Sequence, residues 1–192
     1  MRTARSPFAL AAVALLPLGI AHSALGIRHS AFAQPAPPRL TDTVNDFAHV
    51  IDSASRAELD RRIRALEHAT GDVVVVATVP TYQPYADINE YAVKMFENGG
   101  RGIGQKGKDN GLLIVAAIDD HRVRIETGYD LEGIVPDGYA GETIRNYITP
   151  EFGRGRYGAG LVAGATRLIN HIAEGRGVAI PDVPREQPVS RK

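Results

Sequence analysis

The sequence contains no cysteine and shows no excess of either charge sign. Its 22 Lys and Arg residues balance its 22 Asp and Glu residues, so the formal net charge is +0 at pH 7. The lack of cysteine excludes disulfide bonds, cysteine nucleophiles and cysteine-ligated zinc sites. Because the charge is balanced and basic residues form no stripe with aromatic side chains, the sequence gives no support for nucleic-acid binding. The fold must therefore be held together by its hydrophobic core.

The sequence also has no apolar run of the roughly 20 residues that a membrane-spanning helix needs. The apolar run at residues 8–20 is interrupted by Pro17 and Gly19 and follows a start with two arginines. An A-x-A-like sequence comes next, at residues 31–33. These features predict a secretory signal peptide over residues 1–33, with a retained N-terminal anchor as the alternative. The expected location is periplasmic or secreted, with no membrane span in the mature chain.

Proline-containing segments mark both ends of the predicted folded domain. Residues 34–39 (QPAPPR) are typical of a mobile, extended linker. A polar segment that also contains proline follows residue 178. We therefore predict a linker over residues 34–39, a domain over residues 40–178 and a polar tail over residues 179–192.

Strand and helix patterns alternate along the domain. Apolar runs at residues 73–79 and 112–118 predict buried strands, and the alternation at residues 123–127 predicts a hairpin partner for the second. Helical periodicity predicts four helices, the first capped by Asp52, Ser53 or Ser55 and ended by Gly71, and the others over about residues 87–98, 138–147 and 157–174. The predicted fold is α/β, a three-layer α/β/α sandwich whose mixed sheet has about four strands and helices on both faces.

The glycine-rich loop before the second strand contains the pattern G-x-G-x-x-G at Gly102, Gly104 and Gly107. A dinucleotide-binding loop needs a strand before it and a helix after it, so that the helix N-terminus meets the pyrophosphate. Here the helix comes first and the strand follows, which argues against nucleotide binding. The loop is then either a mobile connection or, at Asp109 and Asn110, a source of oxygen ligands. Asp-Asn-Gly is also an ordinary turn sequence.

The chain resembles the TPM domain, a module of photosystem repair proteins of the thylakoid lumen and of related bacterial exported proteins. The matching segments occur in family order over about residues 41–175, at residues 44–52, 70–79, 102–137 and 148–161. The resemblance implies an α/β/α sandwich, an exported location, a divalent-cation site that usually takes calcium and, in some members, a weak acid phosphatase activity. The chain departs from the family pattern at Asp130, where a glycine is usual, and in its short polar tail.

The resemblance implies that Asp46 and Asp109 are metal ligands, with Asn110 and backbone carbonyls as helpers. For Asp46 the alternative is a role in a turn or a helix cap. The expected ion is Ca²⁺, with Mg²⁺ or Mn²⁺ possible, because hard cations prefer oxygen ligands. The prediction requires Asp46 and Asp109 to lie side by side in the folded chain.

Three further residues are candidate site residues. Asp137 either caps the third helix or binds the metal, and Glu132 is a second possible ligand. Arg124 is a candidate phosphate ligand, although a surface ion pair is the commoner role of arginine. The histidines do not have metal-ligand spacing, and no nucleophile elbow is present, so no catalytic residue is predicted.

Two functions fit these observations. One is an exported cation-binding module that acts through a protein partner in envelope maintenance or assembly. The other is a metal-dependent phosphatase, in which the cation polarises a phosphoryl oxygen. Because the sequence offers no clear general base or covalent nucleophile, we favour the binding module.

Overall fold

The structure is a computed structural model, which describes residues 34–181 and 183–184. The predicted signal peptide at residues 1–33 and most of the predicted tail, from residue 185 onward, lie outside the described residues. Within the described part of the chain, none of the helices has the length and apolar character needed to cross a membrane.

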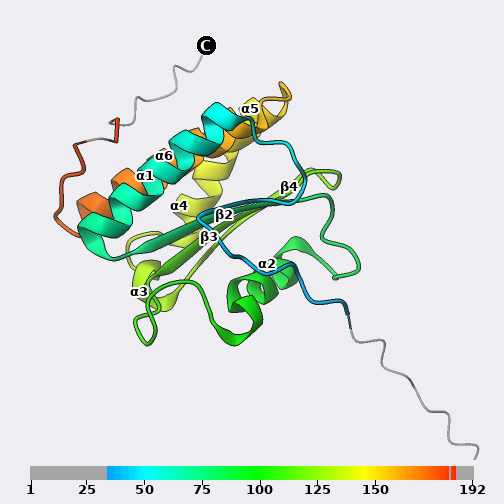
Figure 1. Cartoon of the computed structure of the whole chain (residues 1–192), viewed down its shortest axis with the longest axis horizontal. Helices are drawn as coiled ribbons and strands as arrows, with labels where there is room; N and C mark the ends of the chain where they lie inside the picture. The colour runs from blue at the N-terminus through cyan, green and yellow to red at the C-terminus, as the bar shows by residue number, and fades with distance from the viewer. Residues whose placement is uncertain (1–33, 182, 185–192) are drawn as a thin grey trace, which may run out of the picture. The chain divides into compact units, whose positions relative to one another are not determined.

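A four-stranded mixed sheet forms the centre of the domain (Figure 1). Its strands, in spatial order, are β1 (Val44–Asp46), β2 (Val73–Val79), β3 (Gly111–Ala117) and β4 (Arg122–Thr127). The first three strands are parallel, and β4 runs antiparallel to β3. The two buried strands and the hairpin were predicted correctly. The short strand β1 was not predicted, because three residues are too few to show a periodic pattern.

Two helices connect the parallel strands and begin at aspartate caps. In α1 (Ser53–Thr70), the Asp52 side chain accepts a hydrogen bond from the Ser55 N–H at 2.9 Å, so Asp52 is the cap among the three candidates. In α2 (Ile88–Glu97), Asp87 caps the first turn in the same way. Gly71 ends α1 with a left-handed backbone (φ 81°), which glycine adopts without steric cost.

The C-terminal half of the domain is helical. It comprises α3 (Tyr129–Glu132), α4 (Asp137–Thr143), a π-helical turn (Ile144–Ile148), α5 (Thr149–Phe152) and α6 (Tyr157–Gly175). The third predicted helix is therefore one part of a longer irregular run that begins at Asp137. The single turn α3 was not predicted, since four residues are too short for a helical pattern.

The two faces of the sheet pack against different helices, as predicted for a three-layer sandwich. In β2, Val74 and Val76 point into a core that α1 and α6 cover, whereas Val75, Ala77 and Val79 point into a second core beneath α2. Figure 1 shows α1, α4 and α6 on one side of the sheet and α2 on the other. A strand with apolar side chains on both faces reads as a continuous hydrophobic run, which explains why β2 could be recognised from sequence.

The two helical crossovers have opposite handedness. The steps from β1 to β2 and from β2 to β3 lead in the same direction across the sheet, yet α1 and α2 cover opposite faces. Two such connections cannot share one hand, so one of them is left-handed, which is rare between parallel strands. The general rule of handedness therefore does not determine which face α2 covers.

The packed domain extends beyond the boundaries predicted at residues 40 and 178. At the N-terminal end, Gln34 and Pro35 make hydrogen bonds to the turn before α2. At the C-terminal end, Val183 is buried in the core beneath α1 and α6, and Asn170 of α6 donates a hydrogen bond to the Pro184 carbonyl oxygen at 2.8 Å.

Candidate functional site

The register of the parallel strands separates Asp46 from Asp109. Asp46 pairs with Thr78, and Thr78 pairs with Ala116 near the end of β3. Asp109 lies before the first residue of β3, so the two carboxylates stand about 20 Å apart along the strand direction, at ~3.3 Å per residue. The expectation that Asp46 lies beside Asp109 is wrong. Asp46 is the last residue of β1 and Asp109 precedes β3, and parallel strands place those two ends at opposite edges of a sheet.

Asp46 holds the turn that connects β1 to α1. Its carboxylate accepts hydrogen bonds from the backbone N–H groups of Val50 at 3.1 Å and Ile51 at 3.0 Å, and from the hydroxyl of buried Thr78. This is the turn role that the sequence left open as the alternative to metal ligation. A cation at Asp46 would have to compete with three donors that already satisfy the carboxylate.

The pKa of Asp46 reflects this environment. Burial of the carboxyl group on its own would raise the pKa, but hydrogen bonds from Thr78, Ile51 and Val50 outweigh it, and the charge of Arg56 adds to them. The net effect is a pKa below the ordinary aspartate value. The folded chain therefore keeps Asp46 ionised.

Asn110 is a buried brace for the glycine-rich loop. Its side-chain oxygen accepts a hydrogen bond from the Gln105 N–H, and its side-chain nitrogen donates to the Gly71 carbonyl oxygen, both at 2.8 Å. Ile103 also buries its side chain in the core beneath α2. The loop is thus held at Ile103 and at Asn110. Only its exposed residues, before Ile103 and between Ile103 and Asn110, fit the interpretation of a mobile connection.

Asp109 borders the segment that joins β4 to α3. The residue has a left-handed backbone (φ 50°) and an exposed side chain, and its carbonyl oxygen accepts a hydrogen bond from the Asp130 N–H at 3.2 Å. A Cβ atom on Gly128 would lie 2.1 Å from the same carbonyl oxygen. The close approach of the Asp109 backbone therefore requires glycine at position 128.

Arg124, Glu132 and Asp137 line one pocket on the outer side of β4, which we call the Arg124 pocket. It has a volume of about 320 Å³, and its other lining residues are Glu126, Thr127, Val135 and Pro136. Arg124 lies between two carboxylates, with Nε 3.2 Å from Glu126 and Nη2 3.1 Å from Asp137. Three of the six predicted site residues thus come together here. Two of them, Arg124 and Asp137, are in direct contact.

Asp137 does not cap α4. The residue before α4 is Pro136, and the first turn has no side-chain cap hydrogen bond. The Asp137 carboxylate turns instead toward Arg124 and remains 83% exposed. Of the two roles considered from sequence, capping is therefore wrong, and the carboxylate is in a position to contact a ligand in the pocket.

The charge of the Arg124 pocket favours cations over anions. Its lining carries the three carboxylates of Glu126, Glu132 and Asp137 and the single guanidinium of Arg124, a formal total of −2. A phosphate group would have to compete with the two carboxylates that already pair with Arg124. Among the described residues, however, no three acidic, histidine or cysteine side chains form a ready-made metal site. A cation here would therefore take part of its coordination from water and carbonyl oxygens, as Ca²⁺ commonly does.

Two features near this pocket were missed by the sequence reasoning. Glu126 lies two residues after Arg124 and therefore shares its strand face, a spacing that could have identified it. The second feature is a buried ion pair. Asp72, only 1% exposed, accepts two hydrogen bonds from Arg176 at 2.8 and 3.0 Å. These residues are 104 positions apart, so no local pattern could have linked them.

Arg176 also connects this ion pair to α3. Its guanidinium donates to Asp72 and to Asp130, and the hydrogen bonds to these two carboxylates raise the pKa of Arg176 above its ordinary value. Asp130 is the position at which the sequence departs from the pattern expected from the resemblance. Here it ties the start of α3, and with it the pocket wall that carries Glu132, to the end of α6.

Comparisons with known proteins identify the family of the chain and solved structures with the same fold. A model of the TPM domain matches residues 44–171, which is most of the chain. The chain belongs to the TPM-domain family. The comparison with curated proteins gave no match.

Three solved bacterial structures share the fold. The N-terminal domain of a protein from P. gingivalis is 28% identical, with 77% of this chain and 89% of that chain covered and a TM-score of 0.63. The BA42 protein from the psychrophilic bacterium Bizionia argentinensis is 24% identical, with coverage of 72% and 91% and a TM-score of 0.53. The N-terminal domain of a protein from Corynebacterium glutamicum is 13% identical, with coverage of 81% and 93% and a TM-score of 0.53. The last two likenesses concern the fold alone.

Proposed function

We propose that the chain is an exported TPM-domain module that binds a divalent cation in the Arg124 pocket and acts through a protein partner. The partner's role would lie in envelope protein maintenance or assembly, in the periplasm or outside the cell. The signal-peptide pattern at residues 1–33 supports the location. Ca²⁺ is the expected ion, with Mg²⁺ or Mn²⁺ as alternatives.

The observation that carries the proposal is the excess of carboxylates around Arg124. Glu126 and Asp137 flank the guanidinium at hydrogen-bond distance, and Glu132 lines the same pocket. In this pocket a bound cation would neutralise a local excess of negative charge. Glu126, Glu132 and Asp137 would supply its oxygen ligands. Because no three carboxylates are pre-assembled, we expect a Kd of roughly 0.1–1 mM, typical of extracellular calcium modules.

Calcium titration by calorimetry tests the proposal on metal-stripped protein. The double substitution Glu126→Gln/Asp137→Asn should weaken binding at least tenfold, because it removes two ligand charges from the pocket. Glu97→Gln is a suitable control, since this exposed glutamate pairs with Lys94 on α2. A wild-type protein that takes up no calcium at several millimolar would overturn the proposal. Unchanged affinity in the double variant would instead refute the assigned site.

A low-efficiency phosphatase is the second candidate, and the presence of Arg124 in the pocket favours it. The two functions make opposite predictions for Arg124→Gln. If the pocket binds cations, removal of the guanidinium raises calcium affinity several-fold, because a repulsive charge is lost. If the pocket binds phosphate, the same change abolishes hydrolysis of p-nitrophenyl phosphate. Arg122→Gln is the matched control, because this exposed arginine lies two residues before Arg124 on β4 but does not line the pocket.

A further inference from the structure

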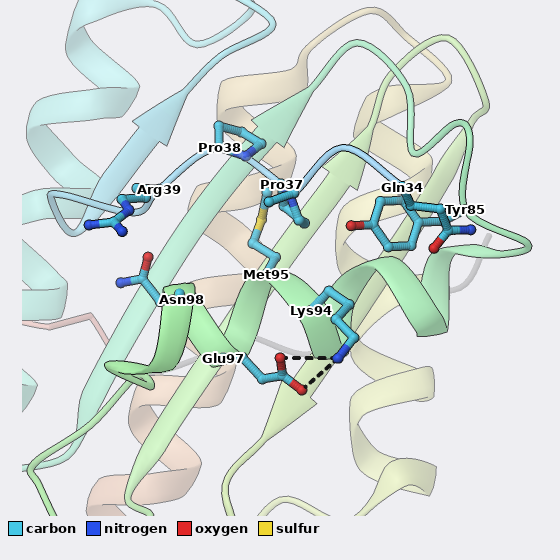
Figure 2. A pocket seen from close by; sticks show the side chains of 11 residues that line it. Gln34, Pro37, Pro38, Arg39, Tyr85, Lys94, Met95, Glu97 and Asn98 are labelled. Carbon is cyan, nitrogen blue, oxygen red and sulfur yellow. Dashed lines mark hydrogen bonds and ion pairs between the residues drawn. The ribbon is translucent and has the colours of Figure 1, made fainter. Parts of the chain in front are cut away.

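The proline-rich segment at residues 34–40 runs along α2 and is held at both ends, although only Pro37 and Leu40 are partly or fully buried. We call these residues the strap. The Tyr85 hydroxyl donates a hydrogen bond to the Pro35 carbonyl oxygen at 3.0 Å, and the Gln34 side-chain nitrogen donates to the Pro84 carbonyl oxygen at 3.4 Å. Figure 2 shows the strap running past Tyr85, Met95 and Asn98. Its prolines keep it extended before docking, which reduces the entropy that is lost on binding.

Asn98 holds the far end of the strap by two hydrogen bonds to one residue. Its side-chain oxygen accepts from the Leu40 N–H at 2.9 Å, and its side-chain nitrogen donates to the Leu40 carbonyl oxygen at 3.1 Å. The Leu40 side chain is 8% exposed and joins the core beneath α2, together with Met95. A groove of about 440 Å³ remains between the strap and α2. The α2 surface thus recognises both backbone and side-chain features of the strap.

The same contacts reach the glycine-rich loop. Asn98 is the first residue after α2, and its left-handed backbone (φ 45°) begins the turn into that loop. A Cβ atom on Gly99 would lie 3.5 Å from the Arg39 guanidinium, so Arg39 lies beside this exposed glycine. Leu40 also shares its core with Ile103, the apolar anchor of the loop. The strap therefore fixes the start of the loop from two sides.

The other end of the loop borders the Arg124 pocket. Asp109 contacts the backbone of Gly128 and Asp130. These two residues lie in the chain between Thr127 and Glu132, which both line the pocket. The glycine-rich loop therefore begins at Asn98, which holds the strap, and ends at Asp109, which contacts the pocket wall.

We propose that residues 34–40 form an intramolecular strap that controls the glycine-rich loop and, through it, the Arg124 pocket. When the strap is docked, the loop is held in the conformation that supports the pocket. Release of the strap, for example by a partner that binds the proline-rich segment, loosens the loop and weakens ligand binding. Only this last step rests on the proposed function.

Asn98→Gly tests the strap in the full chain. Glycine keeps the left-handed backbone and removes the two side-chain hydrogen bonds to Leu40. Because it also adds backbone freedom beside Gly99 and Gly100, cleavage after Arg39 is the readout specific to the strap. With the strap loosened, trypsin should cut after Arg39 on the order of tenfold faster, as expected for the loss of two hydrogen bonds. Amide exchange at residues 99–107 should also increase, with no cation present. Unchanged cleavage and unchanged exchange would both contradict the proposal.

A tyrosine pair supplies a gentler test with a matched control. Tyr85→Phe removes the hydroxyl that binds Pro35, whereas Tyr82→Phe removes a hydroxyl from the same turn that makes no hydrogen bond to the strap in the described structure. Cleavage after Arg39 should rise several-fold in the first variant and stay at the wild-type rate in the second. Equal rates in the two variants would refute the role of Tyr85.

Two further measurements separate the alternatives. Calcium titration of Asn98→Gly should show several-fold weaker binding than the wild type. If the wild type binds calcium, and Asn98→Gly shows increased exchange but the same calcium affinity as the wild type, the link between the strap and the pocket is wrong. If the wild type binds no calcium, the proposed function fails and the exchange data still decide the strap. Sedimentation should show a monomer, because the strap is proposed to bind α2 of its own chain. A dimer in which protection of Arg39 from trypsin depends on protein concentration would show instead that the strap binds α2 of a second copy.

Discussion

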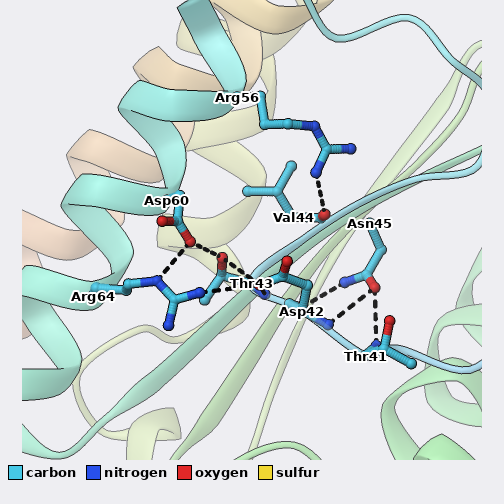
Figure 3. Close-up of polar contacts among 8 residues, drawn as sticks. All are labelled: Thr41, Asp42, Thr43, Val44, Asn45, Arg56, Asp60 and Arg64. Atoms are coloured by element: carbon cyan, nitrogen blue, oxygen red, sulfur yellow. Dashed lines mark hydrogen bonds and ion pairs between the residues drawn. The ribbon is translucent and has the colours of Figure 1, made fainter. Parts of the chain in front are cut away.

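At the level of single residues, the buried and partly buried polar side chains of this domain mainly hold backbone and partner groups. Asp46 satisfies a turn, Asn110 braces a loop and Asp72 pairs with Arg176. Figure 3 shows a similar arrangement around β1, where the Asn45 side chain bonds the backbone of Thr41 and Asp42. Buried polar groups cost free energy unless they are paired, so such saturated groups are poorly placed to bind ligands. The exposed carboxylates around Arg124 are better placed.

Asp46→Asn should destabilise the domain in a pH-dependent way. The pKa of Asp46 is lowered on folding, so its contribution is present above the unfolded pKa of about 3.9 and is lost as pH falls through the lower folded value. At neutral pH we expect a loss of ~1–2 kcal/mol in the free energy of unfolding, because one acceptor oxygen is replaced by a donor. Below the folded pKa the difference should shrink.

Urea unfolding at neutral and acidic pH measures this effect. Asp119→Asn, which changes an exposed carboxylate in the turn between β3 and β4, is the control and should match the wild type at each pH. A destabilisation of Asp46→Asn that stays constant down to the lowest pH would contradict the role of the ionised carboxylate.

At the scale of elements, the edge of the pocket depends on close backbone crossings. The start of β3 is crossed by the glycine-rich loop, where a Cβ atom on Gly111 would lie 2.1 Å from the Ile103 carbonyl oxygen. Gly128 makes a similar crossing with Asp109. These contacts are between backbone atoms, which cannot move aside as a flexible side chain can. The relative position of β3, β4 and α3 therefore depends on glycine at both sites.

Gly128→Ala should disturb this arrangement for steric reasons alone. The backbone of Gly128 is extended (φ −72°, ψ 158°), so alanine adopts it without strain, and the only penalty is the clash with the Asp109 carbonyl oxygen. We expect a destabilisation of about 1–3 kcal/mol in urea unfolding, as for an overpacked site. Gly133→Ala is the matched control, since no atom lies within 4 Å of its added Cβ atom. A Gly128→Ala protein as stable as this control would show that the crossing is not tight.

At the scale of the whole molecule, two hydrophobic cores stabilise a chain that has no disulfide bonds. The core beneath α1 and α6 and the core beneath α2 share the strands β2 and β3. Segments from both ends of the described chain add to them, with Leu40 in one core and Val183 in the other. Any ligand that binds only the folded domain should therefore stabilise the whole unit.

Calcium should raise the melting temperature of metal-stripped protein. At a calcium concentration of ten times the Kd, linkage adds ~1.4 kcal/mol to the free energy of unfolding, which corresponds to a rise of a few degrees for a domain of this size. Arg124→Gln should show a larger rise at the same concentration. Differential scanning calorimetry with sodium chloride at matched ionic strength separates binding from screening. A rise that persists in Glu126→Gln/Asp137→Asn would place the ion elsewhere.

Much of the fold could be predicted because its signals are local. The apolar run at Val73–Val79 predicts a strand that is buried on both faces. Asp87 and the residues after it predict the start of a helix. Short elements such as β1 and α3 were missed because they have too few residues to show a period. For the candidate site, the residue types were found at Arg124, Glu132 and Asp137, but their meeting in one pocket depends on the packing of α3 and α4 against β4.

The class of the fold and the main helices and strands could be predicted from the amino-acid sequence, since these follow from hydrophobic period, caps and turn residues along the chain. The family was indicated by the resemblance of four segments and is shown by the match of the TPM-domain model over residues 44–171. The tertiary structure decided which carboxylates meet. It placed Asp46 and Asp109 at opposite edges of the sheet, joined Asp72 to Arg176 and docked residues 34–40 on α2. These outcomes depend on strand register and on contacts between residues far apart in the chain, which a local pattern does not encode.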